Sequence, residues 1–181
     1  MPASADFTPL PTERLLLRGF EADDLAELAA LLADPQVMRY SVRGVMSTAA
    51  SAEFLDHCRN TLQSQGWGPL AVIERRSGCL AGFCGVSSEC FEGVDEVMLG
   101  YRFAPGFWGR GLASEAVAAV LERLFVGSGP ESVLAVVQPE NLASLRVLHK
   151  NGFTGFVNAR YHGLGVRVYR LRRADWPGRR C

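Results

Sequence analysis

The chain has 181 residues, of which 48% are hydrophobic and 21% are charged, so it can bury a full core and does not have the composition of a disordered chain. Its 19 basic and 19 acidic residues cancel, and the zero net charge argues against a protein that binds mainly nucleic-acid phosphates. No apolar stretch is long enough to cross a bilayer, and residues 1–11 lack the pattern of a secretion signal, so a cytoplasmic location with no membrane partner is expected.

The first third of the chain predicts one strand and two helices. Residues 1–11 contain three prolines and little periodicity, which indicates a loose arm. A strand is predicted at 13–20, followed by a helix with leucines at helical spacing that stops at Pro35. A second helix is predicted at 48–65.

The rest of the chain alternates hairpin strands with two further helices. The continuous apolar run at 133–137 is typical of a central strand that is covered on both faces. The element order, β-α-α-β-β-β-α-β-α-β-β, predicts one α+β domain at 12–173, with arms at 1–11 and 174–181 and a mixed, mostly antiparallel twisted sheet flanked by helices. The other elements are expected as strands at 69–75, 79–87, 95–103, 153–160 and 166–171, and as helices at 112–125 and between Asn141 and Gly152.

The strongest local signal is the glycine-rich turn from Trp108 to Ser114, which opens directly into the helix at 112–125. Gly109 and Gly111 let the backbone approach a ligand closely, and the helix start offers free N–H groups and the positive end of its dipole. These features favour a phosphate ligand. A tight strand-to-helix turn, with glycines needed only for packing, would leave the same pattern.

Other ligand classes fit this turn and the rest of the sequence less well. A nucleotide P-loop requires a lysine where Leu112 stands. The dinucleotide fingerprint GxGxxG is matched only as GxGxxS, and the acid at the required distance, Glu131, precedes the next strand instead of following it. The five cysteines lack CxxC spacing and the three histidines lack an HExxH pattern, so no metal site is expected.

A second block, at 141–153, follows the predicted central strand. Asn141, Ser144 and Leu148 fall on one stripe of the expected helix. The simpler alternative is that Asn141 is a plain N-cap and that Ser144 only supports the first helical turn.

The two blocks together resemble the GNAT acetyltransferase superfamily. The turn at 108–113 is similar to the family's [Q/R]xxGx[G/A] segment, which cradles the pyrophosphate of acetyl-CoA, and the second block is similar to its NxxSxxVxxKxGF pattern. The segments 12–18 and 99–102 resemble the ribosomal-protein N-terminal acetyltransferase branch. The resemblance implies an N-acetyltransferase with acetyl-CoA as co-substrate and no metal. The implied cofactor contacts are Tyr101, Arg102, Phe103, Trp108, Gly109, Arg110, Gly111, Leu112, Ala113, Ser114, Asn141, Ser144 and Lys150.

Three departures from the family pattern bear on catalysis. Trp108 replaces the glutamine or arginine that often begins the turn. Leu148 stands where many relatives have a tyrosine that protonates the leaving thiolate, and Ser144 is the nearest hydroxyl on that stripe. Met98 stands where relatives often have a glutamate, and Glu96 lies on the same strand face. The candidate catalytic residues are therefore Ser144 and Glu96, and a surface carboxylate is the alternative interpretation of Glu96.

The resemblance also implies direct attack of a neutral amine on the thioester, through a tetrahedral intermediate that accepts an N–H from the backbone at 99–103. An α-amine is about one-tenth neutral at pH 7 and a lysine amine under about one-thousandth, which favours a peptide N-terminus as acceptor. Residues 1–100 carry 14 acids and 7 arginines (−7), which suits a small cationic amine instead. An exposed strand edge or the final hairpin offers a homodimer surface. The competing function is a GNAT-like module that binds acyl-CoA without transferring the acyl group.

Overall fold

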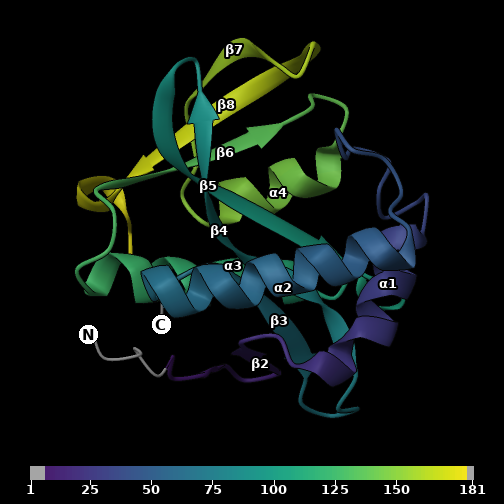
Figure 1. The fold of residues 1–181 in the computed structure, drawn as a ribbon. Helices are drawn as coiled ribbons and strands as arrows, with labels where there is room; N and C mark the ends of the chain where they lie inside the picture. Colours follow the sequence, from purple (N-terminus) through teal and green to yellow (C-terminus); the bar gives the residue numbers. More distant parts are fainter. Residues whose placement is uncertain (1–6, 179–181) are drawn as a thin grey trace.

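The structure, a computed structural model, describes residues 7–178 and contains one sheet with helices on both faces (Figure 1). The eight strands are ordered β1-β2-β3-β4-β5-β6-β8-β7. They are β1 (Leu10–Pro11), β2 (Leu15–Arg18), β3 (Pro69–Glu74), β4 (Leu80–Phe91), β5 (Val94–Phe103), β6 (Ser132–Val137), β7 (Phe156–Tyr161) and β8 (Leu164–Arg172). The α-helices are α1 (Leu25–Ala33), α2 (Thr48–Gln65), α3 (Leu112–Val126) and α4 (Leu142–Lys150).

Two hydrophobic clusters hold the helices to the two faces of the sheet. Leu28 of α1 and Leu55 of α2 pack with Phe83 of β4 on one face. Val117 of α3 and Leu145 of α4 belong to the larger cluster on the opposite face, which buries alternate residues of the same strands. In Figure 1, α2 lies in front of the sheet and α3 lies behind it. Within residues 7–178, no helix is long and apolar enough to cross a membrane.

The mixed, mostly antiparallel sheet predicted from the sequence is confirmed, and so is the second helix. The Ser47 hydroxyl accepts the N–H of Ala50 at 3.2 Å, which caps the start of α2. Gly66 ends the helix in the left-handed conformation, with φ of 74°. The strand predicted at 133–137 is β6, which lies inside the sheet between β5 and β8.

Several predicted boundaries were wrong for identifiable reasons. Residues 10 and 11 of the predicted loose arm form β1, paired with Leu17 and Leu16. The strand predicted at 79–87 continues to Phe91, because Glu92 and Gly93 both have positive φ and form a two-residue turn that keeps both strands paired to their ends. The strand predicted at 153–160 begins at Phe156 instead.

The interior pair β5 and β6 is the exception in the sheet. It is parallel, and its strands share one register pair, Met98 with Leu134. By contrast, β4 and β5 pair over ten positions, from Gly82–Phe103 to Phe91–Val94. The two parallel strands therefore separate beyond Met98, toward the end of β5 that leads into the glycine-rich turn.

Gly82 lets β4 lie close to the end of β5. A Cβ on Gly82 would come within 2.0 Å of the Arg102 carbonyl oxygen, and that oxygen is backbone and cannot swing away. We therefore expect Gly82→Ala to lower the free energy of unfolding by about 3 kcal/mol, measured by urea titration. Gly100→Ala is the matched control on β5, because a Cβ there meets no atom within 4 Å. Equal stability of the two variants would contradict this packing.

Candidate active site

A cavity of about 250 Å³ lies where β5 and β6 separate. The end of β5, the end of β6, the start of α4, the connection between α1 and α2 and the β7–β8 hairpin all contribute to its walls. Because β5 and β6 diverge here, backbone groups on their facing edges lack the ladder partners that a continuous sheet would supply, and a ligand can take those places. The lining includes Tyr40, Gly100, Tyr101, Gln138, Ser144 and Tyr161.

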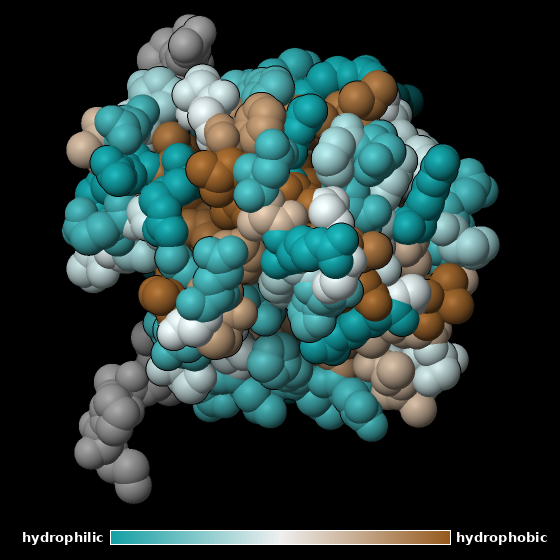
Figure 2. Space-filling view, turned by 90° about the horizontal axis from the view of Figure 1, so that it is seen from above, coloured by the Kyte–Doolittle hydropathy of each residue, from teal (hydrophilic) through white to brown (hydrophobic). Residues whose placement is uncertain are grey.

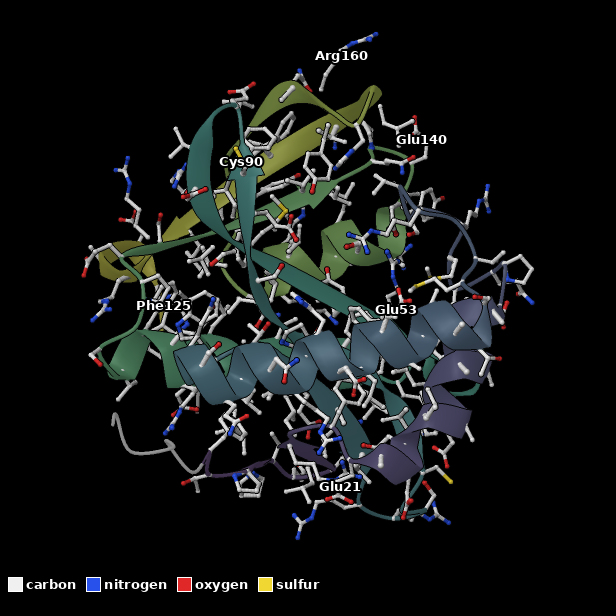
Figure 3. The ribbon with its side chains drawn as sticks, in the orientation of Figure 1. Glu21, Glu53, Cys90, Phe125, Glu140 and Arg160 are labelled. Carbon is white, nitrogen blue, oxygen red and sulfur yellow. The ribbon has the colours of Figure 1, made fainter. Side chains whose placement is uncertain are left out.

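The connection between α1 and α2 is fastened over one end of this cavity. The Tyr40 hydroxyl donates to the Glu140 carbonyl at 3.2 Å, and the Gln138 side-chain amide donates to the Tyr40 carbonyl at the same distance. Figure 3 shows Glu140 beside this connection. The two hydrogen bonds fix a segment far away in sequence against the end of β6, so it forms a wall of the cavity.

Tyr101 and Ser144 are in contact in the wall of the cavity. The Tyr101 hydroxyl lies 2.7 Å from Ser144 Oγ and also donates to the Ser144 carbonyl at 3.1 Å. Burial raises the pKa of the Tyr101 phenol well above its usual value, so the phenol is neutral at physiological pH. The predicted Ser144 hydroxyl thus has a hydroxyl partner from β5. This pairing could not be predicted from the sequence, because it depends on how α4 packs on the sheet.

Asn141 has the structural role that the simpler interpretation gave it. Its side-chain oxygen accepts the N–H of Ser144 at 3.1 Å and caps α4. Both residues also line the cavity, so the cap holds the Ser144 hydroxyl at the cavity wall.

The glycine-rich turn has the backbone geometry expected of it. Gly109 and Gly111 have φ of 72° and 77°, a region that side chains with a Cβ rarely enter. Gly111 is the N-cap of α3 and offers no side chain to its first N–H groups, which leaves these donors for a ligand. The Trp108 indole N–H donates to the Phe103 carbonyl at 2.6 Å, so this residue braces the turn against the end of β5.

The start of the chain braces the same turn from its other side. Arg14 donates to the Arg110 carbonyl at 2.8 Å and forms an ion pair with Glu115 in the first turn of α3. The Thr12 hydroxyl also donates to Glu115, at 2.6 Å. Burial alone would raise the pKa of Glu115, but the hydrogen bonds from Thr12 and Arg14 outweigh it and lower that pKa. The segment 12–18 entered the sequence analysis only as a resemblance, and this bracing role was not foreseen.

The other predicted cofactor contacts differ in what they can offer a ligand. Phe103 and Leu112 are buried in the core, so only their backbone groups are available. The Arg110 guanidinium pairs with Glu74, and Lys150 is exposed at the end of α4. Ala113 and Ser114 lie in the first turn of α3, beside the uncapped N–H groups.

Glu96 and Arg102 lie on the opposite face of β5 from Tyr101. The Glu96 carboxylate forms two hydrogen bonds with the Arg170 guanidinium, at 2.5 and 3.0 Å, and it is not among the residues that line the cavity. Arg102 pairs in register with Phe83, which belongs to the cluster under α1 and α2. Arg102 lines the cavity from that side, apart from the Tyr101–Ser144 pair and the glycine-rich turn.

Comparisons with known proteins agree on one family. The acetyltransferase (GNAT) domain model matches residues 14–154. An uncharacterized N-acetyltransferase of Bacillus subtilis, YnaD, is 32% identical over 143 residues, which cover 79% of this chain and 81% of the relative. The chain therefore belongs to the GNAT acetyltransferase family and is an acetyl-CoA-dependent acyltransferase.

Solved structures share its fold over nearly their whole length. A GNAT-family acetyltransferase from Bacillus anthracis matches with a TM-score of 0.77 at 26% identity, covering 92% of this chain and 99% of that one. RimL, a ribosomal L7/L12 alpha-N-protein acetyltransferase solved in complex with coenzyme A, matches with a TM-score of 0.73 at 18% identity, covering 91% and 98%.

The glycine-rich turn can be tested with two matched glycines. Gly111 and Gly93 both have positive φ, and a Cβ would meet no atom within 4 Å at Gly93 and only the Arg14 guanidinium, at 3.6 Å, at Gly111, but Gly93 lies in the distant β4–β5 turn. We expect Gly111→Trp to weaken CoA binding by at least about tenfold in calorimetric titration, because the indole would cover the N–H groups at the start of α3. Gly93→Trp carries the same backbone strain and should bind CoA as the wild type does. Unchanged affinity in Gly111→Trp would remove the turn from the binding site.

Proposed function

We propose that this GNAT enzyme moves the acetyl group of acetyl-CoA to an amine that enters the cavity from the side of α1 and α2. The observation that carries the proposal is the Tyr101–Ser144 hydroxyl pair in the wall of the cavity between β5 and β6. The uncapped start of α3 supports it, because it offers donors for a pyrophosphate. RimL, the ribosomal L7/L12 alpha-N-protein acetyltransferase that shares this fold, supports a peptide α-amine as one acceptor class.

The residues of the turn fit a CoA pyrophosphate through their backbone. The N–H groups from Gly109 to Ser114 would hold the phosphate oxygens, and Trp108 and Arg14 keep that backbone in place. When bound, acetyl-CoA would supply the acetyl group as a thioester carbonyl that an amine can attack. The edge of β5 beyond Met98 offers backbone N–H groups for the carbonyl oxygen, as expected for the segment 99–103.

The hydroxyl pair is suited to deliver a proton to the leaving sulfur. If the Tyr101 hydroxyl donates to Ser144 Oγ in place of the Ser144 carbonyl, the Ser144 proton is free to point into the cavity. As Ser144 protonates the leaving sulfur, Tyr101 gives its proton to the serine, and the proton that the attacking nitrogen loses on becoming an amide returns to the Tyr101 oxygen. The two hydroxyls thus act as a relay and end in their starting state. In this proposal Ser144 is the acid that protonates the sulfur, and Tyr101 supplies the proton to Ser144. The tyrosine that protonates the thiolate in many family members is replaced here by Leu148.

The chain needs no carboxylate base if the amine arrives neutral. Glu96, the predicted base, is held by Arg170, and acting as a base would require breaking that ion pair. No aspartate or glutamate of the described chain lines the cavity. We therefore assign Glu96 the role of a structural carboxylate, and we propose that the amine loses its proton in water before it binds.

The location and the assembly stay predictions from the sequence. A cytoplasmic enzyme is expected. A homodimer through the final hairpin is supported by the edge strand β7, which exposes Phe156 and Val157. Figure 2 shows hydrophobic areas, in brown, bordered by hydrophilic side chains on the face seen from above.

The proton relay predicts a loss of turnover without a loss of CoA binding. Ser144→Ala and Tyr101→Phe should each lower kcat by about 100-fold, because each removes one hydroxyl of the same relay. The double variant should be little worse than either single variant. Tyr169→Phe is the control, since it removes a buried phenol hydroxyl outside the cavity. Wild-type kcat in Ser144→Ala would contradict the relay, provided that calorimetry shows intact CoA binding.

The absence of a protein base from the described cavity predicts how the rate depends on pH. The value of kcat/KM should rise with pH and level off at the acceptor's own amine pKa, about 8 for a peptide N-terminus and about 10.4 for a lysine side chain. Measuring both acceptors on the wild type and on Glu96→Gln gives the test. A break at one pH shared by both acceptors, which disappears in Glu96→Gln, would restore Glu96 as the base.

A further inference from the structure

We infer that Arg102 binds an anionic group of the acceptor, so that the substrate is an amine which also carries a carboxylate or a phosphate. The inference rests on the proposed function and deepens it. It takes the place of the small cationic amine suggested by the net charge of the first hundred residues.

Arg102 differs from the other partly buried arginines of the described chain because it has no partner. Arg18 is paired with Asp24, Arg167 lies over the Phe156 ring, and Arg173 donates to the Gly127 carbonyl. Within residues 7–178, the Arg102 side chain forms no hydrogen bond, ion pair or ring contact. Burial lowers its pKa, as expected of a cation that has left water without gaining an opposite charge.

The unpaired Arg102 side chain lies in the wall of the cavity. In the described chain, Arg173 Nε is the only sealed side-chain nitrogen or oxygen that lacks a hydrogen bond, so the Arg102 nitrogens keep some accessible surface. Arg102 lines the cavity, and it is the only charged side chain that does so among the described residues. An anion in the cavity would therefore meet a guanidinium whose fork of donors is unused, and a bidentate contact is available to it.

The position of Arg102 assigns this anion to the acceptor. Arg102 shares the α1–α2 face of the sheet with Phe83, whose ring packs against Phe54 of α2 with 5.2 Å between centroids. Tyr101 points to the opposite face, where it meets Ser144 of α4. The glycine-rich turn opens into α3 on that opposite face as well. A group that reaches Arg102 thus comes from the side away from the expected thioester sulfur.

A positive charge at this point also agrees with a neutral amine. A guanidinium beside the cavity disfavours a second cation, so an acceptor ammonium would bind less well than the free amine. An acceptor that carries its own anion can pair that anion with the guanidinium, so Arg102 selects the substrate class.

The test uses pairs of amines in which one member carries an anion that the other lacks, and each affinity is compared per neutral amine because the anion also raises the amine pKa. Phenylalanine against phenylalaninamide tests a carboxylate, and O-phosphoethanolamine against ethanolamine tests a phosphate. Binding of each amine to the CoA-loaded protein is measured by calorimetry, and acetyl transfer is measured separately. We expect the anionic member of at least one pair to bind about tenfold more tightly to the wild type. The pair that shows the preference identifies the anion.

Three variants separate the role of Arg102 from general effects of charge. Arg102→Gln should abolish the preference within the pair, and Arg102→Lys should keep part of it. Arg160→Gln removes an equal charge from an exposed position on β7, where Figure 3 shows the side chain pointing away from the molecule, and it should keep the full preference. All three should bind CoA with wild-type affinity.

The outcomes distinguish this inference from the proposed function. An anion preference in binding that is lost in Arg102→Gln, without acetyl transfer to any amine, would leave the inference standing and defeat the proposed function. If neither pair shows a preference, through equal binding or through no binding, the inference is wrong. It is also wrong if Arg102→Gln weakens CoA binding instead, because Arg102 would then belong to the cofactor contacts implied by the family resemblance.

Discussion

The structure depends on one constraint, which is that β5 and β6 are parallel and touch at a single register pair, Met98 with Leu134. Antiparallel neighbours on both sides keep their ladders, so the sheet stays whole while its centre opens. Backbone donors and acceptors on the open edges must find partners, and inside a protein such groups are costly when left alone. A ligand that lies between the strands can supply these partners, which explains why the cavity lies at the middle of the sheet and not at its rim.

The two faces of the opened sheet have different proposed roles. On one face, α3 presents its uncapped start and α4 presents Ser144 beside Tyr101, so phosphate binding and proton delivery share a side. On the other face, the connection between α1 and α2 closes over Arg102 and the apolar floor near Met98. Because side chains alternate along β5, neighbouring residues of one strand face different substrates. An enzyme that joins two molecules can use such a strand as the wall between them.

The sequence predicted the elements well where the signal was local. The helix at 48–65 and the strand at 133–137 are each decided by a few adjacent residues, and each appears in the structure. The glycine turn was also predicted, since positive φ at Gly109 is a local property. What was missed depends on contacts between distant segments. The Tyr101–Ser144 pair, the Glu96–Arg170 ion pair and the isolation of Arg102 all follow from how strands and helices pack, and periodicity carries no information about them.

The bracing of the glycine turn by the start of the chain has a consequence for folding. Arg14 and Glu115 are 101 residues apart in sequence, so their contact closes a loop that contains four of the eight strands, β2 to β5. Contacts of such long range are slow to form, because the entropy of closing the loop is lost before the contact can stabilise it. During synthesis the first strand leaves the ribosome long before α3 exists, and the phosphate turn cannot be complete until both are present. The glycine-rich turn is thus completed late in folding. A chain that binds CoA firmly has already formed the contact between its N-terminal segment and α3.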